Sequence, residues 1–290
     1  MKFRITVPAS TANIGSGFDM AGIALNLYNT FDFNFNTEGI TFSDDTYSFT
    51  TSLVLDTFFT VLNTYNIEPP SNIHLHTKSH IPIARGLGSS STCIVAGIIA
   101  ANRYADLKLS KLDIAKIAND IEGHPDNVVS AVIGNMNLSL ADKKLYNQNF
   151  KIHDDLTFIA IIPNYEVLTK DARDIMPDNY QISDVIHTSS RTAFLKVAFE
   201  TGNKELIASV TKDKLHQPYR QKLIKNYDDI DHFLNKSKAL THWISGAGPT
   251  IIALVKKSDA HELYNEITLK FGKEHAILNL QICDKGAIIV

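Results

Sequence analysis

Residues 82–92, PIARGLGSSST, place two glycines before a run of hydroxyl side chains. Gly86 and Gly88 permit positive φ angles and let the backbone approach a bulky anion closely. The serines and Thr92 supply hydroxyl groups, and a helix predicted over 91–105 would direct the positive end of its dipole toward the same point. These residue types suit phosphate binding. Taken alone, however, such a segment is more typical of a turn that caps a helix.

Two better-known phosphate motifs do not fit this segment. A P-loop ends in Gly-Lys-Ser or Gly-Lys-Thr, and no lysine occurs in residues 82–93. A dinucleotide fingerprint needs a third glycine, at the place where Ser91 stands. Any phosphate here would therefore rest on backbone amides, hydroxyls and a helix N-terminus rather than on lysine.

Two further glycine-rich segments have the same character. Residues 7–22, VPASTANIGSGFDMAG, follow a predicted strand at 2–7 and contain the acidic residue Asp19. Residues 244–254, ISGAGPTIIAL, join two predicted strands. Separately, the first suits a loop that caps a helix and the second a tight hairpin turn. Together with residues 82–92 they strengthen the phosphate interpretation.

The elements that must position these segments are a mixture of strands and helices. Strands are predicted at 2–7, 27–35, 72–79, 136–140 and 156–163, from alternating or continuous apolar residues. Helices are predicted at 52–66, 91–105, 170–176, 184–201, 203–211 and 228–238. Ser110 and Gly123 have the residue types of an N-cap and a C-cap for another helix between them. This mixture predicts an α+β fold with a domain boundary near residue 155.

The bulk composition is that of an ordinary soluble globular protein. The 290 residues are 44% hydrophobic and 20% charged, with a net charge of −3, which gives no sign of a nucleic-acid or membrane partner. We expect neither a signal peptide at the start of the chain nor an apolar run long enough to span a bilayer. Cys93 and Cys283 are too few for a disulfide framework, which favours reduced thiols in the cytoplasm.

The glycine-rich segments, read with EGHPDNVVSAVIGN, LTKDAR and HQPYR, resemble the motifs of the GHMP kinases, which transfer phosphate from ATP to small alcohols. The resemblance runs from residue 5 to about residue 255. It implies a two-domain α+β architecture. Residues 1–155 would form an N-terminal ATP-binding domain with a ribosomal-protein-S5-like α/β fold. Residues 156–290 would form a C-terminal domain with a ferredoxin-like α+β fold.

The resemblance also implies how the nucleotide is held. The ATP phosphates would be wrapped by a loop made of Pro82, Ile83, Ala84, Arg85, Gly86, Leu87, Gly88, Ser89, Ser90, Ser91 and Thr92. In this family a loop serine and a glutamate on a following helix hold Mg²⁺, and Ser90 and Glu122 match these positions best. Without the family, Glu122 would be interpreted as a solvated surface residue.

Within the family, the chain most resembles the members that phosphorylate L-homoserine. Asn13 and Asp19 would then bind the amino acid, His124 would lie beside it, and Arg173 and Arg220 would grip its carboxylate. For each arginine the ordinary alternative is a surface ion pair. The resemblance further implies a homodimer and makes L-threonine a plausible feedback inhibitor, because it is similar to the substrate.

The proton acceptor of the reaction is left open by the sequence. Some relatives carry an aspartate near the hydroxyl, but the comparable position here is Asn127, which cannot take a proton. Asp126 and His124 are its neighbours, and a route without any protein base is equally consistent with a loose transition state.

Two other functions are compatible with the motifs. One is a kinase of the same family for another small alcohol such as mevalonate, which lacks an ammonium group for Asp19. The other is a regulator that keeps the fold without catalysis. The retention of both Glu122 and the serine-rich loop argues against the regulator, since a pure binding protein would not need them together.

Overall fold

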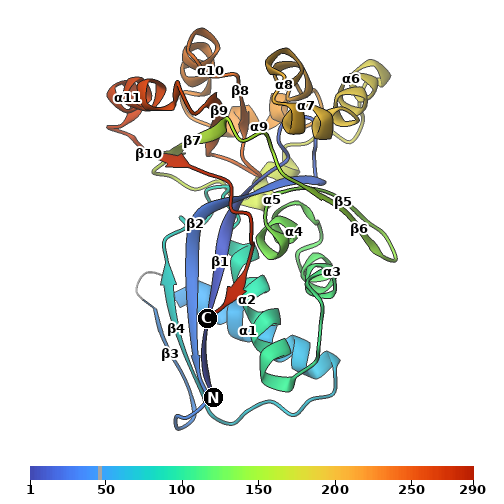
Figure 1. Ribbon diagram of the computed structural model, residues 1–290, viewed down its shortest axis with the longest axis vertical. Helices are drawn as coiled ribbons and strands as arrows, with labels where there is room; N and C mark the ends of the chain where they lie inside the picture. Colours follow the sequence, from blue (N-terminus) through green and yellow to red (C-terminus); the bar gives the residue numbers. More distant parts are fainter. Residues whose placement is uncertain (45–47) are drawn as a thin grey trace.

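The computed structural model describes residues 1–44 and 48–290 and contains two antiparallel-rich sheets (Figure 1). In the described residues the first sheet has the order β11-β1-β2-β4-β3, and a β5–β6 hairpin is attached to β2. Its strands are β1 (Lys2–Ala12), β2 (Ala21–Asn34), β3 (Ile40–Asp44), β4 (Ile73–Ser79), β5 (Met136–Ala141), β6 (Leu145–Phe150) and β11 (Ile288–Ile289). The second sheet has the order β10-β7-β9-β8. Its strands are β7 (Leu156–Pro163), β8 (Thr241–Ile244), β9 (Ile251–Lys256) and β10 (His275–Leu280).

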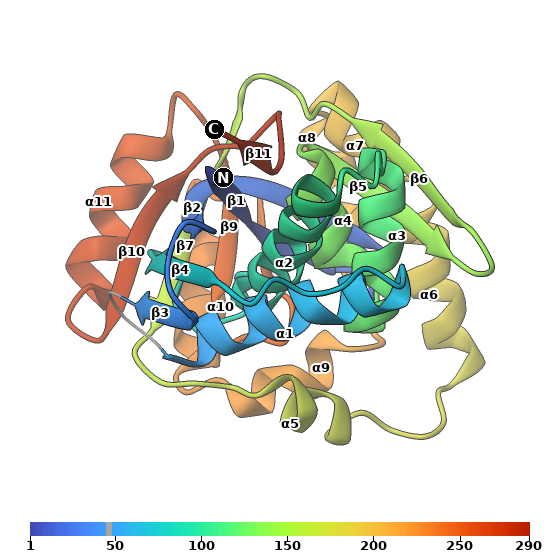
Figure 2. The same cartoon turned by 90° about the horizontal axis from the view of Figure 1, so that it is seen from below.

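Four helices accompany the first sheet and lie beside one another when the molecule is seen from below (Figure 2). They are α1 (Ser48–Thr64), α2 (Ser89–Ala105), α3 (Lys111–Glu122) and α4 (Asp126–Ile133). Helix α2 is buried along nearly its whole length, because small and apolar residues occupy most of its faces. The predicted caps of α3 are confirmed: Ser110 and Asp113 form a capping box, and Gly123 ends the helix at φ 90°.

The second sheet carries the remaining helices. They are α5 (Thr169–Asp174), α6 (Ile182–Thr192), α7 (Leu195–Thr201), α8 (Lys204–Val210), α9 (Gln217–Arg220), a 3₁₀ turn at Gln221–Leu223, α10 (Tyr227–Lys236) and α11 (Ala260–Phe271). One face of this sheet packs against α10 and α11, with Ile230 and Leu263 fully buried. The other face shares a core with β1, β2, α7 and α8, where Phe158 and Trp243 are fully buried.

The α+β, two-sheet architecture confirms the predicted fold class. The helix expected over 184–201 is wrong as a single element, because the chain turns at Ala193 and Phe194 and forms α6 and α7 instead. The helix expected from residue 91 begins at Ser89, and the second strand begins at Ala21 rather than 27. Among the described residues, no helix has the length and apolar character needed to cross a membrane.

The predicted boundary at residues 155 and 156 stays a prediction. The second sheet begins at Leu156, but the chain returns to the first sheet at its end, where Ile289 pairs with Ile5 in β1. Both chain ends accordingly lie close together (Figures 1 and 2). The two halves meet along β1 and β2, and the glycine-rich segments lie at this junction.

Candidate active site

The three glycine-rich segments meet through side-chain hydrogen bonds. Ser245, in the third segment, donates its hydroxyl to the Gly86 carbonyl oxygen at 2.6 Å and contacts Thr11 Oγ1 at 2.8 Å. Asn13 Nδ2 donates to the Gly246 carbonyl oxygen at 3.0 Å. The ends of β1 and β8 and the loop before α2 therefore converge on one point.

Close packing at this point requires glycine. Gly86 has φ 73°, and a Cβ atom there would overlap the Ser245 carbonyl oxygen, which belongs to the backbone of another segment. Gly88 has φ 72°, and its Cβ would overlap the Ser10 hydroxyl. Gly88 is also the N-cap of α2, and no side chain caps that helix end. The helix start thus keeps backbone N–H groups for an anion at the point where the segments meet.

A cavity opens beside this junction. Its lining includes these residues of the predicted phosphate loop: Ala84, Arg85, Gly86, Gly88, Ser89, Ser90 and Ser91. Pro82, Ile83, Leu87 and Thr92 do not line it. Leu87 is a core residue, and the Thr92 hydroxyl donates within α2 to the Ser89 carbonyl oxygen at 2.7 Å. Leu87 and Thr92 therefore support the loop without lining the cavity.

Arg85 lies at the cavity, but its guanidinium is already engaged. Nε donates to the Pro163 carbonyl oxygen at 3.0 Å and Nη2 to the Asn164 carbonyl oxygen at 3.2 Å. Glu166 lies 3.4 Å from Nη1. Arg85 therefore fastens the loop to the end of β7 and does not take the place of a P-loop lysine.

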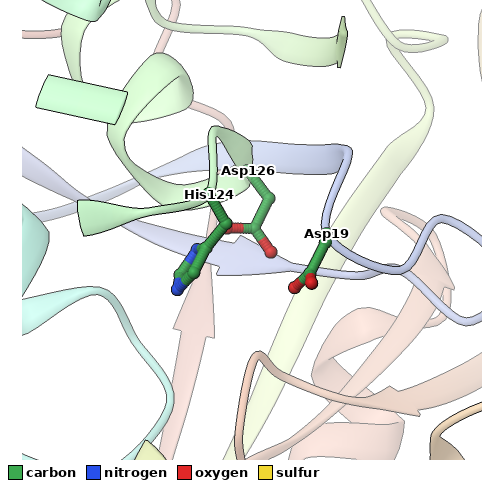
Figure 3. Close-up of side chains that lie close together, drawn as sticks. All are labelled: Asp19, His124 and Asp126. Carbon is green, nitrogen blue, oxygen red and sulfur yellow. The ribbon is translucent and has the colours of Figure 1, made fainter. Parts of the chain in front are cut away.

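An acidic cluster with one histidine occupies another wall of the cavity (Figure 3). Asp19, His124 and Asp126 direct side-chain atoms to within 4.8 Å of one another. His124 Nδ1 lies 2.9 Å from Asp126 Oδ1, which also accepts the backbone N–H of Asn127 at 2.7 Å. Burial alone would lower the pKa of His124, but the hydrogen bond and charge of Asp126, with Glu122 and Asp19, raise it above its ordinary value.

Asp126 is nearly fully buried at the start of α4, with 2% of its surface exposed. Its position next to Gly22 is tight, since a Cβ on that glycine would overlap the Asp126 carbonyl oxygen. Asn127 accepts the Ser10 hydroxyl at its Oδ1, at 2.8 Å. This bond ties the acidic wall to β1 beside the phosphate loop.

Arg173 and Asp19 form a bidentate ion pair. Nη1 lies 3.1 Å from Oδ2 and Nη2 3.0 Å from Oδ1, and the hydrogen bonds that Arg173 donates to Asp19 raise the pKa of Arg173. The two side chains are 41% and 33% exposed. The residues expected to bind opposite ends of an amino acid are thus paired with each other.

Arg220 is buried, with 2% of its surface exposed, and burial lowers its pKa. It donates from Nε to the Ala172 carbonyl oxygen at 3.1 Å and from Nη1 to the Gly246 carbonyl oxygen at 2.9 Å. Its guanidinium lies 4.9 Å from the centre of the Phe18 ring, and that of Arg173 lies 5.9 Å from the same ring. Phe18 therefore aligns both arginines beside the cavity.

Glu122 and the serine-rich loop face each other. The Ser91 hydroxyl donates to Glu122 Oε1 at 3.3 Å, whereas Ser90 is more exposed and lines the cavity. Burial raises the pKa of Glu122, and the nearby charge of Asp126 acts in the same direction. A half-buried carboxylate beside serine hydroxyls is an oxygen donor set that suits a hard divalent cation.

Several cavity residues were not identified from the sequence. Ser10, Thr11, Ser245 and Gly246 hold the three segments together, and Phe18 supports both arginines. The signal for Ser245 and Gly246 was present in the third glycine-rich segment. Phe18 had no such signal, because its role depends on two arginines that lie more than 150 residues further along the chain.

Comparisons with known proteins agree with this arrangement. Residues 52–135 match the GHMP kinases N terminal domain, and residues 195–273 match the GHMP kinases C terminal region. The homoserine kinase of Clostridium beijerinckii is 35% identical over 292 residues, which cover 99% of this chain and 98% of that protein. The homoserine kinase of Crocosphaera subtropica is 40% identical over 86% of this chain and 84% of its own length.

A solved structure has the same fold. The crystal structure of homoserine kinase from Cytophaga hutchinsonii superposes with a TM-score of 0.88, covering 100% of this chain and 97% of the other, at 24% identity. At that identity the likeness bears on the fold alone.

Proposed function

The chain belongs to the homoserine kinases of the GHMP kinase family, and from this premise we propose that it phosphorylates L-homoserine. The γ-phosphoryl group of ATP would pass to the hydroxyl, giving O-phospho-L-homoserine and ADP, a step in threonine biosynthesis. One observation carries the proposal. One cavity joins a glycine- and serine-rich loop at a helix N-terminus to a wall of paired opposite charges.

The phosphate loop would bind the triphosphate through backbone N–H groups at the start of α2 and through serine hydroxyls. Fixed dipoles of this kind stabilise charge without having to reorganise during the reaction. Gly86 and Gly88 allow the close approach, and their position is fixed by Ser245 and Ser10.

We propose Glu122 and a loop hydroxyl as the protein ligands of Mg²⁺. The fit rests on the half-buried carboxylate of Glu122, which accepts the Ser91 hydroxyl and whose pKa is raised by burial. When bound, Mg²⁺ neutralises charge on the phosphate oxygens. Ser90 and Ser91 both line the cavity, so substitution separates them. Ser90→Ala should change the Mg²⁺ dependence of kcat if Ser90 is the ligand, and Ser91→Ala should do so if Ser91 is.

On the acceptor side, Asp19 would bind the ammonium group and the two arginines the carboxylate of the amino acid. Asn13 supports this wall, since its Oδ1 accepts the backbone N–H of Asp19 at 2.9 Å. Arg220 is held rigidly, so its fork can fix the orientation of a carboxylate.

Asn127, Asp126 and His124 would position the hydroxyl rather than act as a strong base. Asp126 Oδ1 already accepts a backbone N–H and contacts His124, and Asn127 cannot take a proton. A loose transition state needs little help from a base, so the proton can leave to the transferred phosphate or to water.

The acceptor site also suits an inhibitor that resembles the substrate. L-threonine carries the same ammonium and carboxylate groups, so we propose that it competes for the acceptor site. We also propose a cytoplasmic homodimer, consistent with two buried, unpaired cysteines and with the exposed apolar residues Ile182 and Phe194 on α6 and beside α7.

The test is ADP release by purified protein in MgATP with a panel of small alcohols. L-homoserine should stimulate release strongly, and mevalonate should not, because it has no ammonium group for Asp19. Stimulation by mevalonate alone would overturn the proposed substrate. If the protein bound MgATP but released no ADP with any hydroxy amino acid, a regulatory protein would be the better interpretation.

A further inference from the structure

We infer that the Asp19–Arg173 ion pair selects the acceptor, because only a zwitterion can replace both partners of the pair one for one. This inference rests on the proposed function and concerns the same cavity. The pair would close on itself in the free protein and open when an ammonium group takes the place of the guanidinium and a carboxylate takes the place of Asp19.

The pair is built from two elements that are otherwise separate. Asp19 lies at φ 56° in the loop after β1, and its backbone is held by Asn13. Arg173 belongs to α5, a helix of six residues. Both oxygens of the carboxylate are engaged by the two terminal nitrogens of the guanidinium, which is the bidentate geometry of a charge-assisted pair.

The surroundings of Asp19 require a cation. Its carboxylate faces Asp126 and His124 in the cluster of Figure 3. Glu122 lines the same cavity. Three carboxylates in one cavity repel one another unless positive charge compensates them. Arg173 supplies that charge in the free protein, and the ammonium group of an acceptor has the same sign and fits the same role.

Arg173 is held less firmly than Arg220, and this explains where its guanidinium can go after an ammonium group has replaced it at Asp19. Arg220 lies over the same Phe18 ring but is buried and bonded to two backbone carbonyl oxygens, so it stays in place. Arg173 is 41% exposed, and its guanidinium donates two hydrogen bonds to Asp19. Once released, its guanidinium can share a carboxylate with Arg220 across the ring.

A substrate with one charge cannot complete the exchange. A hydroxy acid without an ammonium group would take Arg173 but leave Asp19 uncompensated beside Asp126. An amino alcohol without a carboxylate would leave Arg173 without a partner. Each molecule would lack one of the two charge contacts that L-homoserine would make. Each would also have to break the existing Asp19–Arg173 pair, which lowers the affinity about fivefold for a pair of this exposure.

The experiment compares L-homoserine with 4-hydroxybutyrate, which lacks the ammonium group, and 3-aminopropan-1-ol, which lacks the carboxylate. Dissociation constants are measured by ligand-observed NMR titration, which reaches the millimolar range. In Asp19→Asn the pair is already broken, so 4-hydroxybutyrate should bind about fivefold more tightly than to the wild type. In Arg173→Gln the amino alcohol should gain in the same way, while both variants bind L-homoserine more weakly.

Asp174→Asn is the matched control, because it removes a carboxylate from the exposed side of the same helix. It should leave all three dissociation constants unchanged. If the wild-type protein phosphorylates L-homoserine, unchanged or weaker 4-hydroxybutyrate binding in Asp19→Asn would overturn this inference and leave the proposed function standing. Failure of the wild type to phosphorylate L-homoserine would overturn the proposed function, and the binding preferences would still test the ion pair.

Discussion

The two sides of the cavity handle charge by different means. On the phosphate side, backbone groups and hydroxyls are the proposed ligands, and glycines packed against other backbone segments fix their positions. On the acceptor side, charged side chains are the proposed ligands, and Asp19 and Arg173 pair with each other. The first arrangement is rigid before any ligand arrives, whereas the second must exchange partners.

This difference matches the different requirements of the two proposed ligands. A triphosphate is the same in every kinase reaction and gains most from dipoles that are already aligned. An acceptor must be distinguished from other small alcohols, and discrimination improves when binding groups are left unpaired by the wrong molecule. Substitutions on the phosphate side should therefore reduce activity mainly by changing its geometry. Substitutions on the acceptor side should do so mainly by changing its charges.

The largest expected effect is on the geometry of the phosphate side. Gly86→Ala would push a Cβ into the Ser245 carbonyl oxygen and separate the second and third segments. We expect kcat/KM for ATP to fall by about 1,000-fold in ADP release assays. Gly39→Ala is the matched control: Gly39 also has positive φ, but nothing lies within 4 Å of its Cβ position. Equal activity losses in both variants would show that backbone strain, not packing, is responsible.

The carboxylate of the phosphate side gives the next effect. Glu122→Gln removes the half-buried carboxylate proposed for Mg²⁺ and should lower kcat by about 100-fold, with saturation at higher Mg²⁺. Steady-state kinetics across a Mg²⁺ series measure this. Asp120→Asn lies on the same helix and pairs with Lys116 at the surface, so it should have wild-type kinetics. A Glu122→Gln enzyme with normal Mg²⁺ dependence would remove Glu122 from the metal site.

The acceptor side should show a smaller and more selective loss. Arg220→Lys keeps the charge but cannot make both bonds to the Ala172 and Gly246 carbonyl oxygens. We expect the KM for L-homoserine to rise by about 30-fold. The KM for ATP should change little, and Arg103→Lys, at the far end of α2, serves as control. A parallel rise in the KM for ATP would mean that the two sides are not separable.

The smallest effect concerns the support of the acceptor side and depends on pH. His216 is fully buried, its Nε2 lies 2.8 Å from the Gly15 carbonyl oxygen, and its ring stacks on Phe18. Burial lowers its pKa, with Asp213 opposing that shift. As the pH falls through the unfolded value of about 6.5, the unfolded chain takes up a proton that the folded chain resists, so stability is lost.

His216→Gln keeps a donor for Gly15 but does not titrate. At pH 7.5 we expect its Tm about 3 °C below the wild type, because the stacking on Phe18 is lost. This difference should shrink toward pH 5 in thermal unfolding scans. His232→Gln, at an exposed position on α10, should show no such trend. A difference that stays constant with pH would contradict the role of burial at His216.

The sequence was most informative where function depends on residue type in a local segment. Gly86, Gly88 and the serines after them have the residue types of a phosphate loop, but alone they also suit a helix-capping turn, and the two other glycine-rich segments and the family resemblance were needed to choose between these interpretations. Asp19, Glu122 and the arginines needed the family resemblance, since isolated charged residues are usually at the surface.

What escaped prediction depends on contacts between distant segments. The bond from Ser245 to Gly86, the Asp19–Arg173 pair and the shared ring of Phe18 join parts of the chain that no local pattern connects. The same limit applies to the break between α6 and α7, where apolar periodicity continues but the chain turns to pack on the second sheet. Tertiary packing decided these features.

The return of β11 to the first sheet has a consequence for how the molecule assembles. Ile5 and Thr6 find partners in Ile289 and Ile288, nearly the whole chain length away, which makes this one of the least local pairings in the fold. The other end of the same strand carries Ser10 and Thr11 at the cavity. Cutting the chain after residue 155 would thus separate β1 from one of its partner strands, and trimming the last few residues would loosen the strand that carries Ser10 and Thr11 at its other end.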